Sequence, residues 1–347
     1  MLLLQKKIIN DKKNNNNNKQ RKNMNNFKKI GLTALAASLV STSVFAGEVT
    51  VAGSASMTVD GYSSSGTQDA GKGFSMGNQL TFTGGGELEN GLTVGISFVL
   101  DQGDNGNTDA GAAEAPFDSH SVSISSDALG KLTMHGEGGS NAQAAIDGTA
   151  AGDIWDDFDG ATTGVAVESS ASGSDILVYA LPEMIDGLAV SASYSPQQTS
   201  PASSTAYALT YTGVEGLSVS YGKGEENTGT STTETDTTTM KASYAYNSFT
   251  VAYSNNDHSS NVADADQETT SYKVSYTVSD AISVSYGIEE IKKENDDQEA
   301  EFEKLAVSYT SGGMTLSASQ ASSTDALHGT TDLEDRDYWS LGLAFAF

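Results

Sequence analysis

Apolar and polar residues alternate along most of the chain after Gly47, which is the pattern of strands with two unlike faces. In the segment 48–60, for example, Val49, Val51 and Met57 share one face, and the residues between them are small or polar. Successive side chains of a strand point to opposite sides, so this alternation predicts one apolar face and one polar face. The same rhythm recurs in later segments, among them 92–100, 188–195 and 281–288.

Segments of this kind predict about 16 strands. They lie at 48–60, 74–86, 92–100, 119–125, 131–135, 175–181, 188–195, 206–212, 217–222, 239–246, 249–254, 270–278, 281–288, 304–310, 313–319 and 338–347. Tight turns, such as 89–91 and 127–130, alternate with long polar connections. The long connections lie near 61–73, 101–118, 136–174, 196–205, 223–238, 255–269, 289–303 and 320–337. This layout predicts an all-β fold, a transmembrane antiparallel up-and-down β-barrel with short periplasmic turns and long extracellular loops.

A soluble β-sandwich or a repetitive acidic surface protein would show a similar alternation. Two features favour the membrane barrel. Aromatic residues such as Tyr246, Phe249 and Tyr276 gather near strand ends, as in the aromatic girdles of membrane barrels. The opposite faces carry mostly Ser, Thr, Gly and Ala, which are too small and polar to fill a dry core but suit a wet lumen.

The N-terminus divides into two unlike pieces. Residues 1–23 are rich in Lys and Asn and show no apolar periodicity, so we interpret them as the product of a start assigned too early, with a longer leader as the alternative. Residues 24–46 have a basic start, an apolar centre and a small-residue end at Ala46, which predicts a signal peptide cleaved there. A membrane anchor is less favoured because the apolar stretch is too short to span a bilayer as a helix. The barrel is then expected over 47–347.

The charge of the chain is strongly acidic, with 18 Lys and Arg against 45 Asp and Glu and a net charge of −27. Removal of 1–46 takes away nine basic residues and one acidic residue, so the mature chain carries −35. Nucleic acid is excluded as a partner, because its binding needs cationic surface that displaces phosphate counterions. A large negative charge instead suits a pore that attracts cations.

The chain closes on an apolar alternating strand that stops at Phe347. That ending resembles the assembly signal of outer-membrane barrels. Three segments resemble the trimeric general-diffusion porins of the α-proteobacterial branch of Gram-negative bacteria. They are "EVTVAGSASMTVDG" at 48–61, "LTFTGGGELENGLTVGISF" at 80–98 and "SVSISSDALGKLTMHGEG" at 121–138.

The resemblance implies a water-filled outer-membrane channel for passive diffusion of ions and small hydrophilic solutes. It implies a homotrimer, and barrel-assembly machinery that reads Phe347. It also implies that the third long loop, 136–174, folds into the lumen and narrows it. Two alternatives stay open, a substrate-selective channel and an acidic, barrel-anchored surface or adhesion protein. Outer-membrane lipid and lipopolysaccharide are expected neighbours, with divalent ions as possible bridges from the acidic loops.

The loop 136–174 is rich in carboxylates, which would raise the local cation concentration at a constriction and make the channel cation-selective. They are Asp147, Asp153, Asp156, Asp157, Asp159 and Glu168. A solvated acidic loop like the others is the alternative interpretation. Four of these residues, Asp153, Asp156, Asp157 and Asp159, also form a candidate calcium site, because Ca²⁺ prefers oxygen ligands. The spacing is not that of an EF-hand, and no cofactor is required.

Four lysines fall on the polar side of the strand alternation and are expected to face the lumen, since a Lys at mid-bilayer costs about 2–4 kcal/mol. They are Lys131, Lys241, Lys273 and Lys304. The resemblance implies a field across the pore between such lysines and the loop carboxylates. The sole Arg after Ala46 is Arg336, so the arginine cluster that would make this field strong is absent.

Catalysis has no support in the sequence. The four His residues stand in no recognisable nucleophile or zinc motif, and the "GGGE" at 84–87 is followed by no helix that could complete a phosphate loop. We therefore expect a protein that is not an enzyme.

Overall fold

The computed structural model describes residues 49–63, 72–101, 118–159, 167–170, 172–196, 202–228, 233–296, 298–326 and 335–347. The predicted leader at 1–46 lies outside these ranges and stays a prediction. The chain divides into two compact units, of which the larger contains 48–85 and 92–347. The described part of the smaller unit is 86–91, where a turn is closed by the Gly91 N–H, which donates to the Leu88 carbonyl at 2.9 Å.

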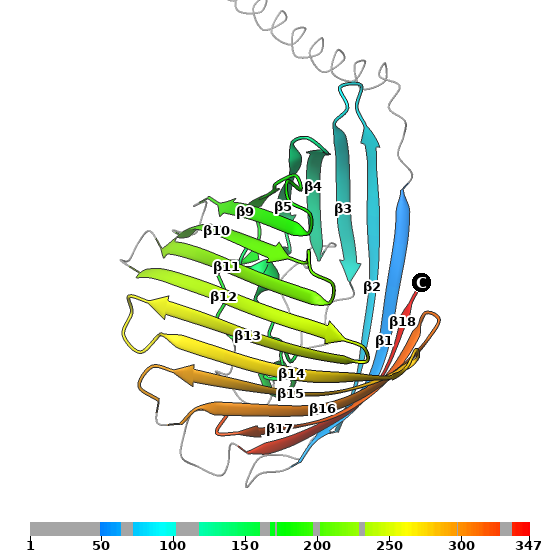
Figure 1. Cartoon of the computed structure of the whole chain (residues 1–347), viewed down its shortest axis with the longest axis vertical. Coiled ribbons are helices and arrows are strands. Elements are labelled where there is room, and N and C mark those ends of the chain that lie inside the picture. The colour runs from blue at the N-terminus through cyan, green and yellow to red at the C-terminus, as the bar shows by residue number, and fades with distance from the viewer. Residues whose placement is uncertain are drawn as a thin grey trace, which may run out of the picture. The chain divides into compact units, whose positions relative to one another are not determined.

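Among the described residues, sixteen antiparallel strands close into one barrel (Figure 1). Neighbours in the barrel follow chain order, and β18 pairs with β1 to complete the ring. The strands are β1 (Thr50–Tyr62), β2 (Lys72–Glu87), β3 (Thr93–Asp101), β4 (Ser119–Ser126), β5 (Gly130–Glu137), β8 (Ile176–Ala180), β9 (Leu188–Ser195), β10 (Ala202–Tyr211), β11 (Leu217–Thr228), β12 (Thr233–Tyr246), β13 (Phe249–Ser260), β14 (Gln267–Ser279), β15 (Ile282–Lys293), β16 (Ala300–Ser311), β17 (Met314–Thr324) and β18 (Arg336–Ala346).

The remaining elements all belong to the connection between β5 and β8. They are the two-stranded sheet of β6 (Gly139–Ser140) and β7 (Ser172–Gly173), the 3-10 turn η1 (Ala144–Ile146) and the short helix α2 (Asp156–Asp159). In the part of the chain that the structure describes, no helix has the length and apolar character needed to cross a membrane. The predicted fold class and strand number are confirmed.

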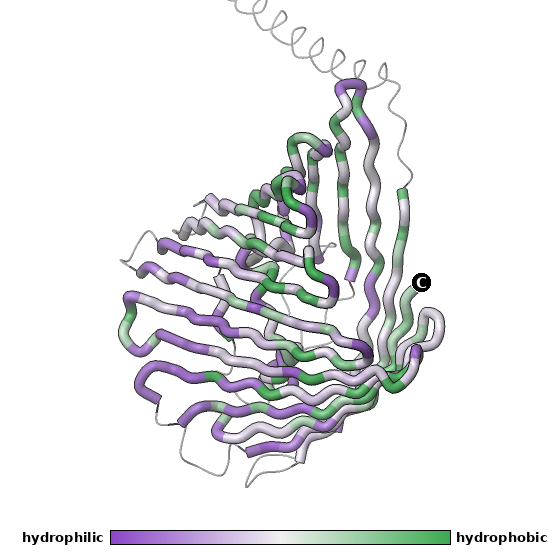
Figure 2. The backbone as a smooth tube through the Cα atoms, in the orientation of Figure 1, coloured by the Kyte–Doolittle hydropathy of each residue, from purple (hydrophilic) through white to green (hydrophobic). Residues whose placement is uncertain are grey.

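The two faces of the barrel wall follow the alternation in the sequence. On β13 and β14, Val251 and Val274 are about half exposed on the outside, whereas Ser254 and Ser271 are buried on the inside. Apolar and polar residues therefore follow one another along the strands (Figure 2). Apolar side chains that face lipid and small polar side chains that face the lumen are what a membrane barrel requires.

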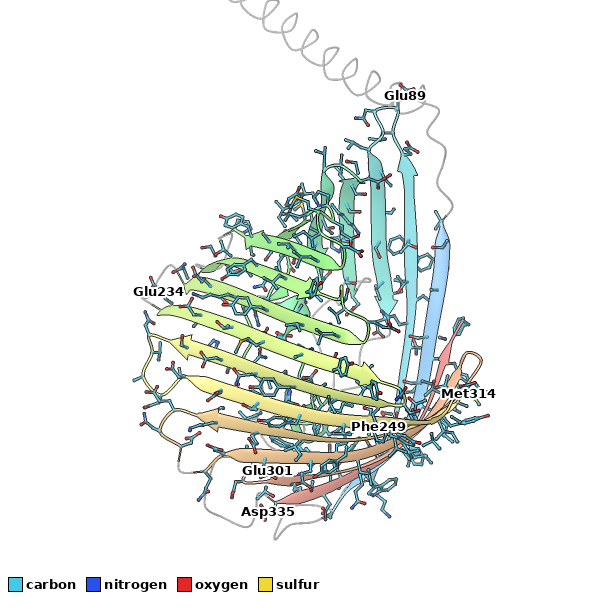
Figure 3. All side chains as sticks on the ribbon, viewed as in Figure 1. Glu89, Glu234, Phe249, Glu301, Met314 and Asp335 are labelled. Atoms are coloured by element: carbon cyan, nitrogen blue, oxygen red, sulfur yellow. The ribbon has the colours of Figure 1, made fainter. Side chains whose placement is uncertain are left out.

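Several strands extend further toward the long loops than predicted. For β13 the prediction ended at 254 and the strand ends at Ser260, and for β15 it ended at 288 and the strand ends at Lys293. These extensions are mostly polar or charged, so the apolar alternation ends before the hydrogen-bonded ladder does. Figure 3 shows Glu234, Glu301 and Asp335 at the ends of the strands remote from Phe249 and Met314. The corresponding predicted long connections were too long, because backbone pairing above a membrane needs no apolar side chains.

The last residue completes the closure of the barrel. The Phe347 N–H donates to the Gly53 carbonyl at 2.9 Å, and the Gly53 N–H donates to the Phe347 carbonyl at 2.7 Å. The Phe347 ring lies directly over Gly53, where a Cβ atom would collide with it. A glycine on β1 therefore makes room for the terminal aromatic side chain.

Candidate channel constriction

The connection between β5 and β8, residues 138–175, is attached to the inner wall of the barrel, and we call it the constriction loop. Three of its backbone N–H groups donate to serine hydroxyls on the inner face of three strands. Ala142 donates to Ser193 on β9 at 2.8 Å, Ala150 to Ser254 on β13 at 2.8 Å and Ala151 to Ser271 on β14 at 2.9 Å. Because these serines alternate with outward apolar residues, the wall presents hydroxyls to the loop at regular intervals.

Glycines on the inner face allow the loop to approach the wall closely. A Cβ at Gly287 on β15 would lie 2.7 Å from the Ala151 Cβ, and one at Gly222 on β11 would lie 2.8 Å from the Ile146 Cδ1. Larger residues at these positions would push the loop toward the pore axis. The wall sequence therefore sets how far the loop enters the lumen.

The outgoing and returning limbs of the loop are bonded to each other. The Asn141 side-chain amide donates to Ser170 Oγ at 2.8 Å, and the Ser170 N–H donates to Gln143 Oε1 at 3.1 Å. Gln143 in turn donates to Thr239 Oγ1 on β12 at 2.7 Å. Asn141, Gln143 and Ser170 are all buried, so these polar contacts join the two limbs and fix both to the wall.

The far part of the loop ends in an aromatic cluster. Phe158 is buried between Phe302 of β16, Tyr338 of β18 and Tyr62 of β1, with ring centroids 5.6 to 6.4 Å apart. Ile154 belongs to the same cluster and is fully buried. The Tyr62 hydroxyl also donates to the Asp157 carbonyl at 2.5 Å. The loop therefore follows the inner wall from β9 round to β1.

The acidic side chains predicted for the constriction have different surroundings. Asp157 forms an ion pair with Lys304 at 2.7 Å, and Asp153 Oδ1 accepts from the Thr149 N–H at 2.8 Å. Asp156 and Glu168 are exposed, and the Glu168 backbone N–H donates to Gln267 Oε1 at 2.8 Å. The side chain of Asp159 lies outside the described part of the structure.

Asp147 accepts a hydrogen bond from the Ser169 hydroxyl of the returning limb. Burial raises the pKa of the Asp147 carboxyl above its ordinary value, and the nearby Asp153 carboxylate raises it further. The Ser169 hydrogen bond and the charge on Lys241 act in the opposite direction without cancelling the effect of burial.

Three of the four predicted lumen lysines contact the constriction loop from the wall behind it. Lys241 of β12 donates to the Gly148 carbonyl, Lys273 of β14 to the Ala151 carbonyl at 3.4 Å, and Lys304 of β16 to Asp157. Lys131 lies at the start of β5, beside the short turn, and shares its face with His135. Cations and carboxylates therefore lie on the same side of the lumen, which differs from the field across the pore that the resemblance implied.

Sequence reasoning missed Glu289, which is fully buried on the inner face of β15 and accepts hydrogen bonds from Thr149 and Trp155 of the loop. The alternation could have found it. Glu289 lies on the inner face of β15, after the small residues Ser283, Ser285 and Gly287, and it stands level with the predicted constriction.

The candidate calcium ligands are only partly described. Within the described residues, no group of three or more His, Asp or Glu side chains is gathered closely enough to hold a metal ion. Asp157 is engaged by Lys304, and Asp153 by the loop backbone. Since Asp159 is the fourth member of the set, calcium stays a prediction.

The comparison with protein families is decisive. The model of the Gram-negative porin family matches residues 31–315. The chain belongs to the Gram-negative porin family. A porin forms a channel in the outer membrane, and the closed barrel with a loop attached to its inner wall is the corresponding structure. The porin therefore resides in the outer membrane of a Gram-negative bacterium.

Solved porin structures have the same fold as this porin. The anion-selective porin from Comamonas acidovorans is 18% identical, with 86% of this chain and 99% of that chain covered and a TM-score of 0.65. A loop-deletion mutant of OmpT, an outer membrane protein of Vibrio cholerae, is 15% identical, with 87% and 100% covered and a TM-score of 0.64. A mutant porin of Rh. blastica is 15% identical, with 86% and 100% covered and a TM-score of 0.62. None of the curated proteins matches this sequence.

Proposed function

We propose that this porin is a water-filled channel for passive diffusion of ions and small hydrophilic solutes, and that it prefers cations. The observation that carries the proposal is the charge balance of the constriction loop. Its carboxylates include Asp147, Asp153, Asp156 and Glu168. The charge of Lys304 is balanced by Asp157, whereas Lys241 and Lys273 donate to loop carbonyls and keep their charge, so these four carboxylates outnumber the two remaining lysines. Carboxylates beside a narrow passage raise the concentration of cations there.

The Comamonas porin is described as anion-selective. At 18% identity the likeness extends to the fold, while selectivity depends on the few side chains at the constriction. The charge of −35 predicted after removal of 1–46 and the position of the lysines behind the loop both favour cations here. A single Arg after Ala46 also weakens any interpretation as an anion or phosphate channel.

The test is the zero-current potential of the purified protein in a planar bilayer across a KCl gradient. The sign should correspond to potassium preference, and the variant Asp153→Asn/Asp156→Asn should show a smaller potential with the pore still open. Salt should weaken the preference, since the screening length falls to roughly 3 Å near 1 M.

The matched control is Asp236→Asn/Asp257→Asn, which removes two carboxylates from exposed positions on the outer face of β12 and β13. It should leave the potential unchanged. A wild-type sign that indicates chloride preference would show that the lysines govern permeation and would refute cation selectivity.

Two alternatives predict different results. A substrate-selective channel would show conductance block that saturates with one solute. An adhesive surface protein would admit no small sugars in a liposome swelling assay. An enzymatic function would need a catalytic group, and neither the family nor the fold points to one.

We further propose that the porin is a homotrimer that associates through β1–β5. All fourteen tyrosines lie in the described ranges, and the exposed ones are on β8–β10, β12–β16. On β1–β5 the exposed large hydrophobic residues include Met57, Met76 and Met134 but no tyrosine, and the one tyrosine of these strands, Tyr62, packs inside. Tyrosine marks the lipid–water boundary, so a face without it is suited to contact another protein. OmpT of Vibrio cholerae, which is 13% identical with a TM-score of 0.61, is described in a trimer form.

A further inference from the structure

Glu289 has an environment that no other acidic side chain in the described residues shares. Its side chain is fully buried, and none of the ion pairs in the described residues includes it. A buried carboxylate is costly unless hydrogen bonds compensate for the lost water. Its partners all belong to the constriction loop, so the compensation depends on the loop being in place.

The carboxylate is bonded at two points of the loop. Its Oε2 accepts from the Trp155 backbone N–H at 3.1 Å, and its Oε1 accepts from the Thr149 hydroxyl. Both oxygens are used, and each has a different donor. A single wall residue therefore holds the segment 149–155 at both of its ends.

The Thr149 hydroxyl passes this constraint on to Asp153. While it donates to Glu289, the same oxygen accepts from the Asp153 N–H at 2.7 Å, and the Thr149 N–H donates to Asp153 Oδ1 at 2.8 Å. Asp153 has a positive φ of 52°, a conformation that costs about 1 kcal/mol or more for a residue other than glycine. Glu289, Thr149 and Asp153 thus form one hydrogen-bonded chain that stabilises a strained turn.

The inner face of β15 is shaped for this segment over three successive inward positions. Gly287 leaves room for Ala151, Glu289 binds Thr149 and Trp155, and Ile291 packs in the buried cluster with Ile154. The glutamate is the one member of the three that can orient hydrogen-bond donors. Its position is consistent with a role in directing the loop rather than only filling space.

We infer that Glu289 is a positioning residue for ion selectivity: it holds the turn at 149–155, and through Thr149 it sets the direction of the Asp153 carboxylate at the constriction. This inference rests on the proposed channel function. Asp153 and Asp156 act on the permeating ion, and Glu289 acts through them from behind the loop.

The variants Glu289→Gln and Glu289→Asp separate positioning from charge. Glutamine keeps the length but replaces one acceptor oxygen with a donor, so either the bond from the Trp155 N–H is lost or the bond to the Thr149 hydroxyl survives only with its direction reversed. Aspartate keeps the charge but is shorter by one methylene and does not reach both donors. Both variants should show a less uniform conductance than the wild type and a smaller zero-current potential in a KCl gradient.

The matched control is Glu290→Gln, which removes a carboxylate from the next residue of the same strand, on the outer face with Tyr286. It should behave as the wild type. Thr149→Val removes the hydrogen bond to Glu289 from the loop side and leaves the barrel wall unchanged. It therefore tests the same contact if a Glu289 variant does not fold. Heat-modifiable migration in gels identifies the folded protein.

The decisive comparison combines Glu289→Gln with Asp153→Asn. If Glu289 acts through Asp153, the Asp153→Asn change lowers cation preference when it is made in the wild type. The same change made in the Glu289→Gln protein has a much smaller effect or none. Folded Glu289→Gln, Glu289→Asp and Thr149→Val proteins with wild-type conductance and potential would overturn the inference. So would additive effects of Glu289→Gln and Asp153→Asn. A chloride-preferring wild type is a separate result, which refutes the proposed selectivity while the conductance levels still test the positioning.

Discussion

The carboxylates of the constriction loop differ because their immediate neighbours differ. Asp157 has a lysine, Asp153 has two contacts to Thr149, and Asp147 has a serine hydroxyl and a partly buried position. Aspartates of one loop therefore have three different roles: Asp157 forms an ion pair, Asp153 stabilises a turn and Asp147 is a titratable group. A count of acidic residues could not separate these roles.

The first prediction at this scale concerns pH. Because burial raises its pKa, Asp147 should lose its charge at a higher pH than an ordinary aspartate, so cation preference should begin to fall early as the pH is lowered. Stability should change in the opposite sense. The folded chain binds this proton more tightly than the unfolded chain, so stability increases as the pH falls from the raised pKa toward the ordinary value.

Zero-current potentials measured as a function of pH check this expectation. In Asp147→Asn the early step should be missing, and in the outer-face control Asp236→Asn it should remain. Identical titration curves for Asp147→Asn and the wild type would contradict the assignment.

Single strands illustrate why element boundaries were harder to predict than element types. β13 and β15 continue through Asp257 and Glu290, where the outward residues are charged and the alternation of apolar residues has ended. The ladder continues there because backbone hydrogen bonds do not depend on side-chain polarity. The apolar alternation thus reports the membrane-embedded part of a strand and not its whole length.

The closing strand β18 leads to a prediction about assembly. Deletion of Phe347 should lower the yield of folded, heat-modifiable protein in the outer membrane, while the channels that do form keep wild-type conductance. The physical reason is that the terminal aromatic residue is expected to be recognised during insertion.

Gly53→Val separates recognition from packing, since it displaces the Phe347 ring without removing it. If recognition matters, Gly53→Val assembles better than the deletion. An equal loss of folded protein in both variants would indicate that packing over Gly53 is the cause.

The whole molecule provides a test of the trimer. Ala55 on the outer face of β1 and Ala242 on the outer face of β12 are both partly exposed, and they differ in lying on the tyrosine-free and the tyrosine-rich side. Ala55→Trp should abolish the trimer, because a large side chain in place of a methyl group clashes in a packed interface. Ala242→Trp should leave the trimer intact, because lipid accommodates the ring.

Native gels and cross-linking of detergent-extracted protein measure both variants. Trimers from Ala55→Trp at the wild-type level would exclude β1 from the interface. Loss of trimers in Ala242→Trp alone would place the interface on the opposite side of the barrel.

The strand number, the barrel and the inward and outward faces of the strands followed from the sequence. They depend on local alternation and on turn residues, which neighbouring positions along the chain display directly. The inward direction of Lys241, Lys273 and Lys304 followed in the same way, since parity alone sets the side of a strand on which a residue lies.

What the loop contacts depended on the closed barrel. Lys304 and Asp157 are 147 positions apart, Thr149 and Glu289 are 140 apart, and Tyr62 and Asp157 are 95 apart. No local pattern relates such residues; the curvature of the wall and the path of the loop bring them together. For this reason the acidic loop could be recognised from its composition, whereas the contacts that the lysines and the buried Glu289 make with it became evident from the three-dimensional arrangement.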